Sequence, residues 1–499
     1  MKKYDAPGVY INELDPFPVP VVQVPTGVPV FIGYTETAVE EGKNVTGVPV
    51  RISSLAQFEA HFGGEPVFRF DFSLRDGEAL LELDEASRFN MHSALKLFFD
   101  NGGSTCWIMS VGCYGKEASA FIKSADHFGE AVWQELAKLE EPSIVVMPDA
   151  VFLPSAADYK AVWDRGLAHC AEMQNRVAIV DVFKGDRHRT YDEVDVISGQ
   201  TGLRNLLSAQ DMSFAAAYYP WVNTSLHDAV TITFDNVSAG TRQAFFDHVG
   251  QEPSIQADES RKTIVDKLLN SLMDEDKSDA EKASDHKILL GCSRRYNALG
   301  AQAVTAVSVM PPSSALAGAY AMTDNQVGVW KAPANISLAA VLSPCVAISD
   351  AEQEDLNAPL DGKAVNAIRS FAGRGTLVWG ARTLDGNSAE WRYVNIRRTS
   401  IMVEQSIRAG LEPFVFSPNT ATTWLTVKSS IEMFLNSLWK DGALMGATPA
   451  DAYSVDVGLG TTMTSADVEA GYMIVVVKVA LTRPAEFVVL SLRQLVQQN

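Results

Sequence analysis

The sequence predicts a multi-domain protein of mixed α/β class (α+β mixed). Its 499 residues are more than one hydrophobic core usually organises, so we expect two or more domains. Short apolar runs bounded by turn residues alternate with helical patterns through most of the chain. This alternation is typical of a largely parallel sheet with helices on its faces.

The N-terminal part begins with an apolar, proline-rich segment, residues 15–26. Proline breaks helices and removes sheet donors, so this segment should be extended. We expect it either to lie on its own domain or to dock as an arm on a neighbouring subunit. A compact α/β pattern follows: a buried strand at 27–35, a helix within 51–63 capped by Ser53 or Ser54 and stopped by Gly63 or Gly64, a helix at 92–99 and a strand at 105–111.

The middle of the chain continues the alternation and then interrupts it. Strands are predicted at 143–148, 177–183 and 214–219, with a helix at 156–175. Residues 225–300 break the rhythm and are interpreted as an insertion, with a possible strand at 231–234, a helix at 258–273 and a charged, solvated run at 274–287. The α/β pattern then resumes as a strand at 303–310 and a helix at 313–322.

The last third has a different pattern. A turn and strand are predicted at 371–382, and a strand followed by a helix at 393–408. The helix at 424–439 carries one apolar face made of Val427, Ile431, Phe434, Leu435 and Leu438. Strands are predicted at 454–457, 472–481 and 486–493. The last of these is apolar on both faces, so we expect it inside a sheet, and that sheet can belong to another subunit.

These patterns give the following expected domain organisation: an N-terminal arm at 1–25, an N-terminal α/β part at 26–115, a middle domain at 116–370 that includes the insertion, a C-terminal domain at 371–483, and a C-terminal arm strand at 484–499.

Composition and charge favour a high-copy soluble protein. Hydrophobic residues make up 47% and charged residues 20%, and the net charge is -20. An acidic chain repels phosphate groups, so no nucleic-acid partner is expected. No apolar run reaches the roughly 18 residues of a membrane helix, and the first residues carry no apolar signal segment. We therefore expect synthesis and assembly in the cytoplasm without membrane insertion.

The sequence shows no recognisable set of catalytic, metal-binding or cofactor-binding residues. The five cysteines are scattered without CxxC spacing, and the eight histidines include no i, i+4 pair, so no disulfide framework, metal site or cofactor is expected. HExxH, GxSxG and phosphate-loop sequences are absent. The nearest loop, Gly375 to Gly380, is bulky and apolar at its centre. The sequence therefore predicts no catalytic residues and favours a structural role over an enzymatic one.

Several sequence blocks resemble contractile tail sheath proteins, in the family's order. They include Pro7-Gly-Val-Tyr10, residues 26–35 (TGVPVFIGYT), residues 98–103 (FFDNGG), residues 311–324 (PPSSALAGAYAMTD) and residues 378–383 (VWGART). Each block is weak alone, but the ordered set covers nearly the whole chain except residues 225–300. The FFDNGG block and the chain length are most similar to sheaths of extracellular contractile injection systems, which are phage-tail-like particles. Myophage and R-type bacteriocin sheaths are alternatives.

The resemblance implies stacked hexameric rings around an inner tube, arms that complete a shared sheet in neighbouring subunits, and a subtilisin-like middle domain without catalysis. It also implies baseplate and cap proteins as partners, and a particle that is released or docked at a membrane. It assigns the arm contacts to Val19, Val21, Val22, Val24, Phe487, Val488, Val489, Leu490 and Leu492. It assigns the tube-facing positions to Lys428, Glu432 and Lys440. Two functions of another class remain open: a hydrolase, which needs a converging Ser, His and Asp, and a receptor-binding tail protein that uses the insertion.

Overall fold

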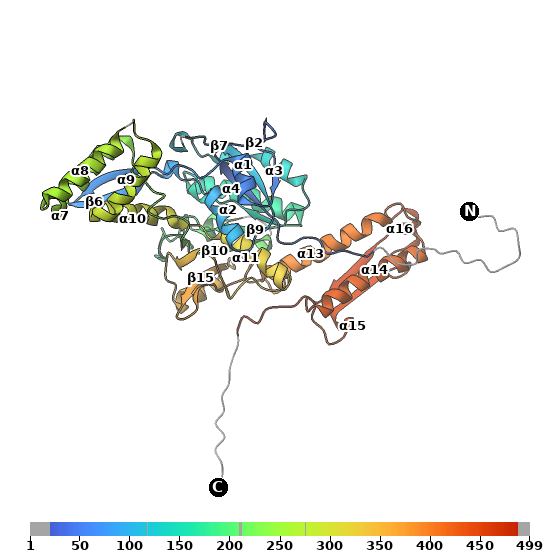
Figure 1. Cartoon of the computed structure of the whole chain (residues 1–499). Helices are drawn as coiled ribbons and strands as arrows, with labels where there is room; N and C mark the ends of the chain where they lie inside the picture. Colours follow the sequence, from blue (N-terminus) through green and yellow to red (C-terminus); the bar gives the residue numbers. More distant parts are fainter. Residues whose placement is uncertain (1–19, 117, 209–211, 275, 488–499) are drawn as a thin grey trace, which may run out of the picture. The chain divides into compact units, whose positions relative to one another are not determined.

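The computed structural model describes residues 20–116, 118–208, 212–274 and 276–487. The contacts divide the chain into two units. The larger unit contains residues 25–398 and the described residues of the segment that begins at Pro484. The smaller unit contains residues 399–483 and the described residues that precede Pro25. Figure 1 shows the chain coloured along its sequence.

The larger unit is built on a nine-stranded sheet. Its strand order is β13 (Ile336–Ser337), β16 (Gly375–Val378), β15 (Val365–Phe371), β10 (Ala215–Tyr219), β9 (Val177–Asp181), β8 (Ile144–Val146), β1 (Pro29–Thr35), β7 (Cys106–Cys113) and β4 (Val50–Ile52). The strands from β15 to β7 run parallel, and antiparallel pairs close both ends. The predicted largely parallel sheet is confirmed.

Helices pack on this sheet because its central strands are apolar on both faces. Every residue of β1, β8, β9 and β10 is buried. Helix α2 (Met91–Asp100) packs on α11 (Ser313–Gln326), and the two contact β1, β8 and β9, while α4 (Ala156–Met173) also packs on β9. The remaining helices of this region are α1 (Leu55–Phe62), α3 (Glu130–Ala137), α5 (Leu203–Leu206) and α12 (Asp350–Asn357). Ser54 caps α1 and Gly63 ends it, as predicted.

A second hydrophobic core lies within the larger unit. The hairpin of β5 (Phe70–Arg75) and β6 (Glu78–Leu83) packs with α6 (Ala239–Gly250), α7 (Pro253–Gln256), α8 (Glu259–Met273), α9 (Asp279–Cys292) and α10 (Arg294–Ser308). Figure 1 shows α8, α9 and α10 gathered around β6. This group exceeds the predicted range 225–300, because it recruits the earlier hairpin and continues to Ser308.

Smaller sheets join these groups. A three-stranded sheet contains β12 (Val309–Met310), β11 (Val222–Thr224) and β14 (Val341–Pro344). A short hairpin pairs β2 (Val39–Glu40) with β3 (Lys43–Asn44).

The smaller unit is an α+β arrangement. It contains most of α13 (Val394–Leu411), then α14 (Ala421–Lys440), α15 (Pro449–Ala452), β17 (Tyr453–Val457), α16 (Ser465–Glu469) and β18 (Val475–Val479). The predicted apolar face of α14 is confirmed, since Val427, Ile431, Phe434, Leu435 and Leu438 are all buried. Helix α14 packs against β17.

Three local predictions were wrong. Residues 231–234 form a turn that leads into a 3-10 helix at 234–236 instead of a strand. Residues 303–308 continue α10, so that the strand is limited to Val309–Met310. The segment 394–408 is helical throughout and has no initial strand. In α10, Ala303 and Val307 pack into the second core, so tertiary contacts override the β-branched composition.

Candidate assembly interface

The described start of the chain lies on its own smaller unit. Val21 is buried, and the Val24 N–H donates to Ser406 Oγ of α13 at 3.0 Å. Gly410 of α13 makes room for this segment, since a Cβ at position 410 would stand 2.7 Å from Val21 Cγ2. Val22, in contrast, is 71% exposed. Of the predicted N-terminal arm residues, two therefore pack within the chain and Val22 is free at the surface, while Val19 lies outside the described residues.

A groove runs between this segment and helix α14. Its volume is about 300 Å³. It is lined by Pro20, Val21, Gln23, Ser430, Met433, Phe434, Ser437, Leu438 and Asp441.

The sheet of the smaller unit has two strands in the described residues, and residues 443–445 pair briefly with 480–482 just beyond β18. Strands β17 and β18 pair antiparallel from Tyr453–Val479 to Val457–Val475, and in the described residues no third strand pairs with either edge. Val476 of β18 is 38% exposed. The unpaired edges of such a sheet are a template for an added strand.

The predicted tube-facing residues lie on α14, away from its buried face. Lys428 Nζ and Glu432 Oε1 are 3.7 Å apart in an i, i+4 pair, and both side chains are partly exposed. Lys440 is exposed at the last position of the helix. Exposed Leu425 and Met433 lie on the same helix. The solvent face of α14 thus mixes charge and apolar surface.

The described C-terminal segment ends on the larger unit. Glu486 accepts hydrogen bonds from Arg382, Asn357 and Tyr393. Burial alone would raise the pKa of Glu486, but these hydrogen bonds lower it. The next residue, Phe487, is 74% exposed. Val488, Val489, Leu490 and Leu492 lie outside the described residues. Sequence reasoning missed Glu486, because its partners are up to 129 positions away.

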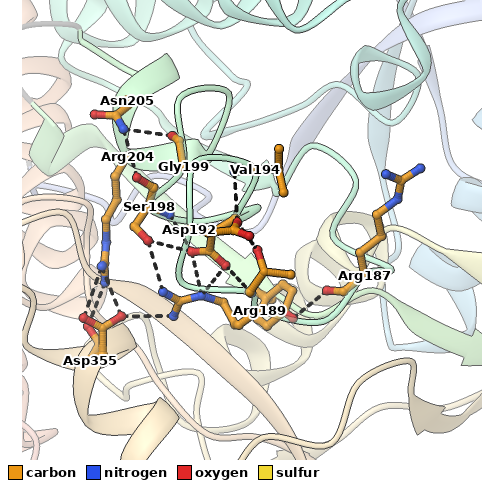
Figure 2. Close-up of polar contacts among 12 residues, drawn as sticks. Arg187, Arg189, Asp192, Val194, Ser198, Gly199, Arg204, Asn205 and Asp355 are labelled. Carbon is orange, nitrogen blue, oxygen red and sulfur yellow. Dashed lines mark hydrogen bonds and ion pairs between the residues drawn. The ribbon is translucent and has the colours of Figure 1, made fainter.

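A second polar network, also missed from the sequence, fixes the loop before α5 (Figure 2). Asp195 accepts from Arg189 Nε at 2.9 and 3.0 Å, from the Thr190 N–H at 3.0 Å and from the N–H and Oγ of Ser198 at 2.9 and 2.7 Å. Arg189 also bridges to Asp355 of α12 at 3.0 Å. Arg204 donates to the same carboxylate at 3.2 Å, so the network ties the loop to α12.

This network bears on the hydrolase alternative, because it contains a serine and a carboxylate. The Ser198 hydroxyl donates to Asp195, an acceptor already saturated by other donors, and no histidine is hydrogen-bonded to either side chain in the described residues. A second such contact joins Ser313 Oγ to Asp181 at 2.5 Å. Burial raises the pKa of Asp181 to about 7. That pair is fully buried at the start of α11, where Asp181 of β9 also accepts from the Ser313 N–H at 2.8 Å, one of the helix's first backbone donors.

The described residues contain no group of three or more His, Cys, Asp or Glu side chains placed to hold a metal ion. None of the helices in the described part is long and apolar enough to span a bilayer.

The fold is similar to that of solved sheath structures over almost the whole chain. The helical sheath of the anti-feeding prophage in its contracted state matches with a TM-score of 0.61 and 26% identity, over 99% of this chain and 100% of that one. The sheath complex of an extracellular contractile injection system, PVC, also in the contracted state, matches with a TM-score of 0.61 and 25% identity, over 99% of each chain.

Sequence comparisons agree over shorter spans. Residues 387–494 match the phage tail sheath C-terminal domain. A tail sheath protein of Burkholderia phage BcepMu is 30% identical over 154 residues, which is 29% of this chain and 31% of that protein. A putative prophage major tail sheath protein of Pseudomonas aeruginosa is 30% identical over 145 residues, 29% of this chain and 37% of that protein. The chain thus matches about a third of the length of these curated relatives.

The resemblance predicted from the ordered sequence blocks is therefore confirmed: in fold over nearly its whole length, and in sequence over its C-terminal part, this chain is similar to the contractile tail sheath proteins, among them those of extracellular contractile injection systems.

Proposed function

We propose that this chain is a sheath subunit that polymerises as stacked hexameric rings around an inner tube and contracts to drive that tube through a target envelope. The observation that carries the proposal is the open-edged β17–β18 sheet, in a chain similar over 99% of its length to a helical sheath solved in a contracted state. Head-to-tail contacts that do not close on themselves generate helical filaments of this kind.

The open sheet supplies a place for exchanged arms. An added strand gains main-chain hydrogen bonds along either edge, and side-chain pockets fix its register. The chain ends are suitable donors, since Val22 and Phe487 are exposed apolar residues next to the segments that carry the remaining predicted arm positions. Such links keep rings connected while subunits rotate.

Contraction then needs no nucleotide. The extended sheath is held in a kinetic trap, and release forms new contacts between subunits that are absent before contraction. The free energy comes from those contacts.

The solvent face of α14 is proposed to face the tube, with Lys428, Glu432 and Lys440 as its polar contacts. The other proposed partners are further copies of this chain, a baseplate and a cap. Assembly takes place in the cytoplasm, and the finished particle is released or docked at a membrane. The net charge of -20 keeps a subunit of high copy number soluble before it assembles.

The test is a deletion that removes the N-terminal arm and spares the rest of the fold. Deleting residues 1–24 would also remove Val21 and the Val24–Ser406 hydrogen bond, whereas deleting residues 1–19 preserves both. We expect the 1–19 deletion to yield a folded subunit that forms no tubes in negative-stain micrographs, at concentrations where the full chain does. Tubes of normal length and yield would contradict the proposed exchange.

A further inference from the structure

Glu486 occupies a cradle of donors on the larger unit. Its Oε1 accepts from Asn357 Nδ2 and Arg382 Nε, each at 2.9 Å. Its Oε2 accepts from Arg382 Nη2 at 2.6 Å and from the Tyr393 hydroxyl at 2.8 Å. The donors come from the last residue of α12, the segment after β16 and the residue before α13. Three parts of the larger unit therefore converge on one carboxylate.

The arginine of this cradle is held independently of Glu486. Arg382 Nη1 donates to the Asn357 carbonyl at 2.8 Å. Its backbone N–H donates to Asn366 Oδ1 at 2.7 Å, and Asn366 Nδ2 donates back to the Arg382 carbonyl at 2.8 Å. The Arg382 side chain is 6% exposed, and Glu486 is its only ion-pair partner in the described part of the chain. A buried guanidinium is costly without a counter-charge, so the site is built to receive a carboxylate.

The position of this contact along the chain is informative. The chain belongs to the smaller unit through Arg483 and to the larger unit from Pro484. Glu486 is reached directly after that change, and it is followed directly by Phe487, whose side chain is 74% exposed. A bidentate ion pair with a buried arginine and a partly buried glutamate thus precedes an exposed apolar residue, which is the first of the predicted arm contacts.

We propose that Glu486 is a positioning residue that fixes the point and direction from which the C-terminal arm leaves the larger unit. This inference rests on the proposed arm exchange. The contact of Glu486 with Arg382, Asn357 and Tyr393, called the clamp below, restricts the conformations of the first residues of the arm. Less entropy is therefore lost when the rest of the arm docks on a neighbour. The neighbour's open sheet then receives a strand whose origin is already placed by the donor subunit.

The first test measures the mobility of the chain around Glu486 and Phe487, called the arm root below, in the full-length subunit. Chymotrypsin cleaves after exposed aromatic residues, but it needs several residues around the bond to adopt its extended geometry. The clamp restricts the backbone at Glu486, next to Phe487, so the bond after Phe487 should rarely adopt this geometry. We expect E486A to raise the cleavage rate there at least tenfold, measured by loss of residues 488–499 in the intact mass. Y393F, which removes one donor and keeps the ion pair, should raise it two- to threefold.

The matched control removes a carboxylate from the same unit at an exposed ion pair. Asp350 bridges to Arg369 at 2.8 Å, and its side chain is 92% exposed. D350A removes one negative charge, as E486A does, but at a site that solvent reaches. Its cleavage rate should equal that of the full wild-type chain. If E486A proves misfolded by circular dichroism, Y393F alone decides. A wild-type cleavage rate in the folded variants would overturn the clamp.

The second test measures assembly. Folded E486A should form at least tenfold fewer tubes than D350A at equal concentration. Faster cleavage with normal tube yield would overturn the positioning role, because the root would then be irrelevant to exchange. A wild-type chain that forms no tubes would count against the proposed function instead, and the cleavage result would still report on the clamp.

Discussion

The buried carboxylate of Asp195 should contribute strongly to the free energy of unfolding of the larger unit. Its side chain is fully buried, and its oxygens accept from Arg189, Thr190 and Ser198 (Figure 2). The substitution D195N conserves shape but removes the charge and turns one acceptor into a donor. That donor then faces the N–H and O–H groups that Asp195 now accepts.

The size of the stability loss in D195N depends on how much of the Arg189 charge is left without a partner. Breaking a buried ion pair by changing one partner costs about 3–5 kcal/mol, because the other charge stays buried. Arg189 retains its contact with Asp355 at 3.0 Å, which offsets part of this cost. We therefore expect D195N to lower the free energy of unfolding by about 3 kcal/mol, near the lower end of that range.

The assay is urea denaturation followed by tryptophan fluorescence, with D355N as the matched control. Asp355 contacts the same Arg189 but is 41% exposed, so solvent compensates for its loss, and D355N should cost less than D195N. A loss below about 1 kcal/mol for D195N, or one no larger than that of D355N, would refute the reasoning.

The pH dependence of this site has a definite sign. Burial alone would raise the pKa of Asp195, but hydrogen bonds from Arg189, Ser198 and Thr190 hold it well below its usual range. A carboxylate with a depressed pKa contributes stability above its unfolded pKa and loses it as the pH falls toward the folded value. The D195N penalty should therefore be constant from pH 8 to about 5 and shrink only below about 4.

Two further predictions concern other sites. Burial and Arg176 lower the pKa of His169 to about 4. Between pH 6.5 and 4 the unfolded state therefore binds more protons than the folded state. Acidification across this window should lower the free energy of unfolding by about 3 kcal/mol. H169Q keeps an acceptor for Arg176, so its unfolding free energy should lose less in the same window, and an unchanged pH profile would contradict this. G410A should displace the N-terminal segment, since the new Cβ would overlap Val21. Elastase should then cleave faster within residues 20–24, and an unchanged rate would show that the segment is not held by this contact.

The parts of the fold that could be predicted from the sequence are those determined by neighbouring residues. The strand β1 was predictable because a continuous apolar run between glycines has few alternatives. Helix α1 was predictable because Ser54 and Gly63 supply local capping chemistry. The apolar face of α14 follows from helical periodicity alone.

The parts that were missed depend on distant contacts. The run from Ala303 to Met310 is rich in β-branched residues, and only its packing into the second core makes most of it helical. The hairpin β5–β6 joins that core across more than 150 positions, as in the hydrogen bond from Phe72 to Thr241. No periodicity in one segment can reveal such a partner.

The same reason applies to the candidate site. The apolar character of the chain ends indicated arms, because a lone segment cannot bury such residues. The sequence did not reveal that Val21 packs against Gly410 in the same chain, or that Glu486 meets Arg382 across 104 positions. The roles of the arm and tube-facing residues between subunits stay predictions.

The measurement that tests the central proposal most directly is electron microscopy of the particle purified with the full chain. The proposed function predicts a striated sheath of stacked hexameric rings around a tube, in extended and contracted forms, with every ring built from copies of this chain. Particles that lack a sheath made of this chain, or a sheath whose rings are not linked by strands added to β17–β18, would contradict it.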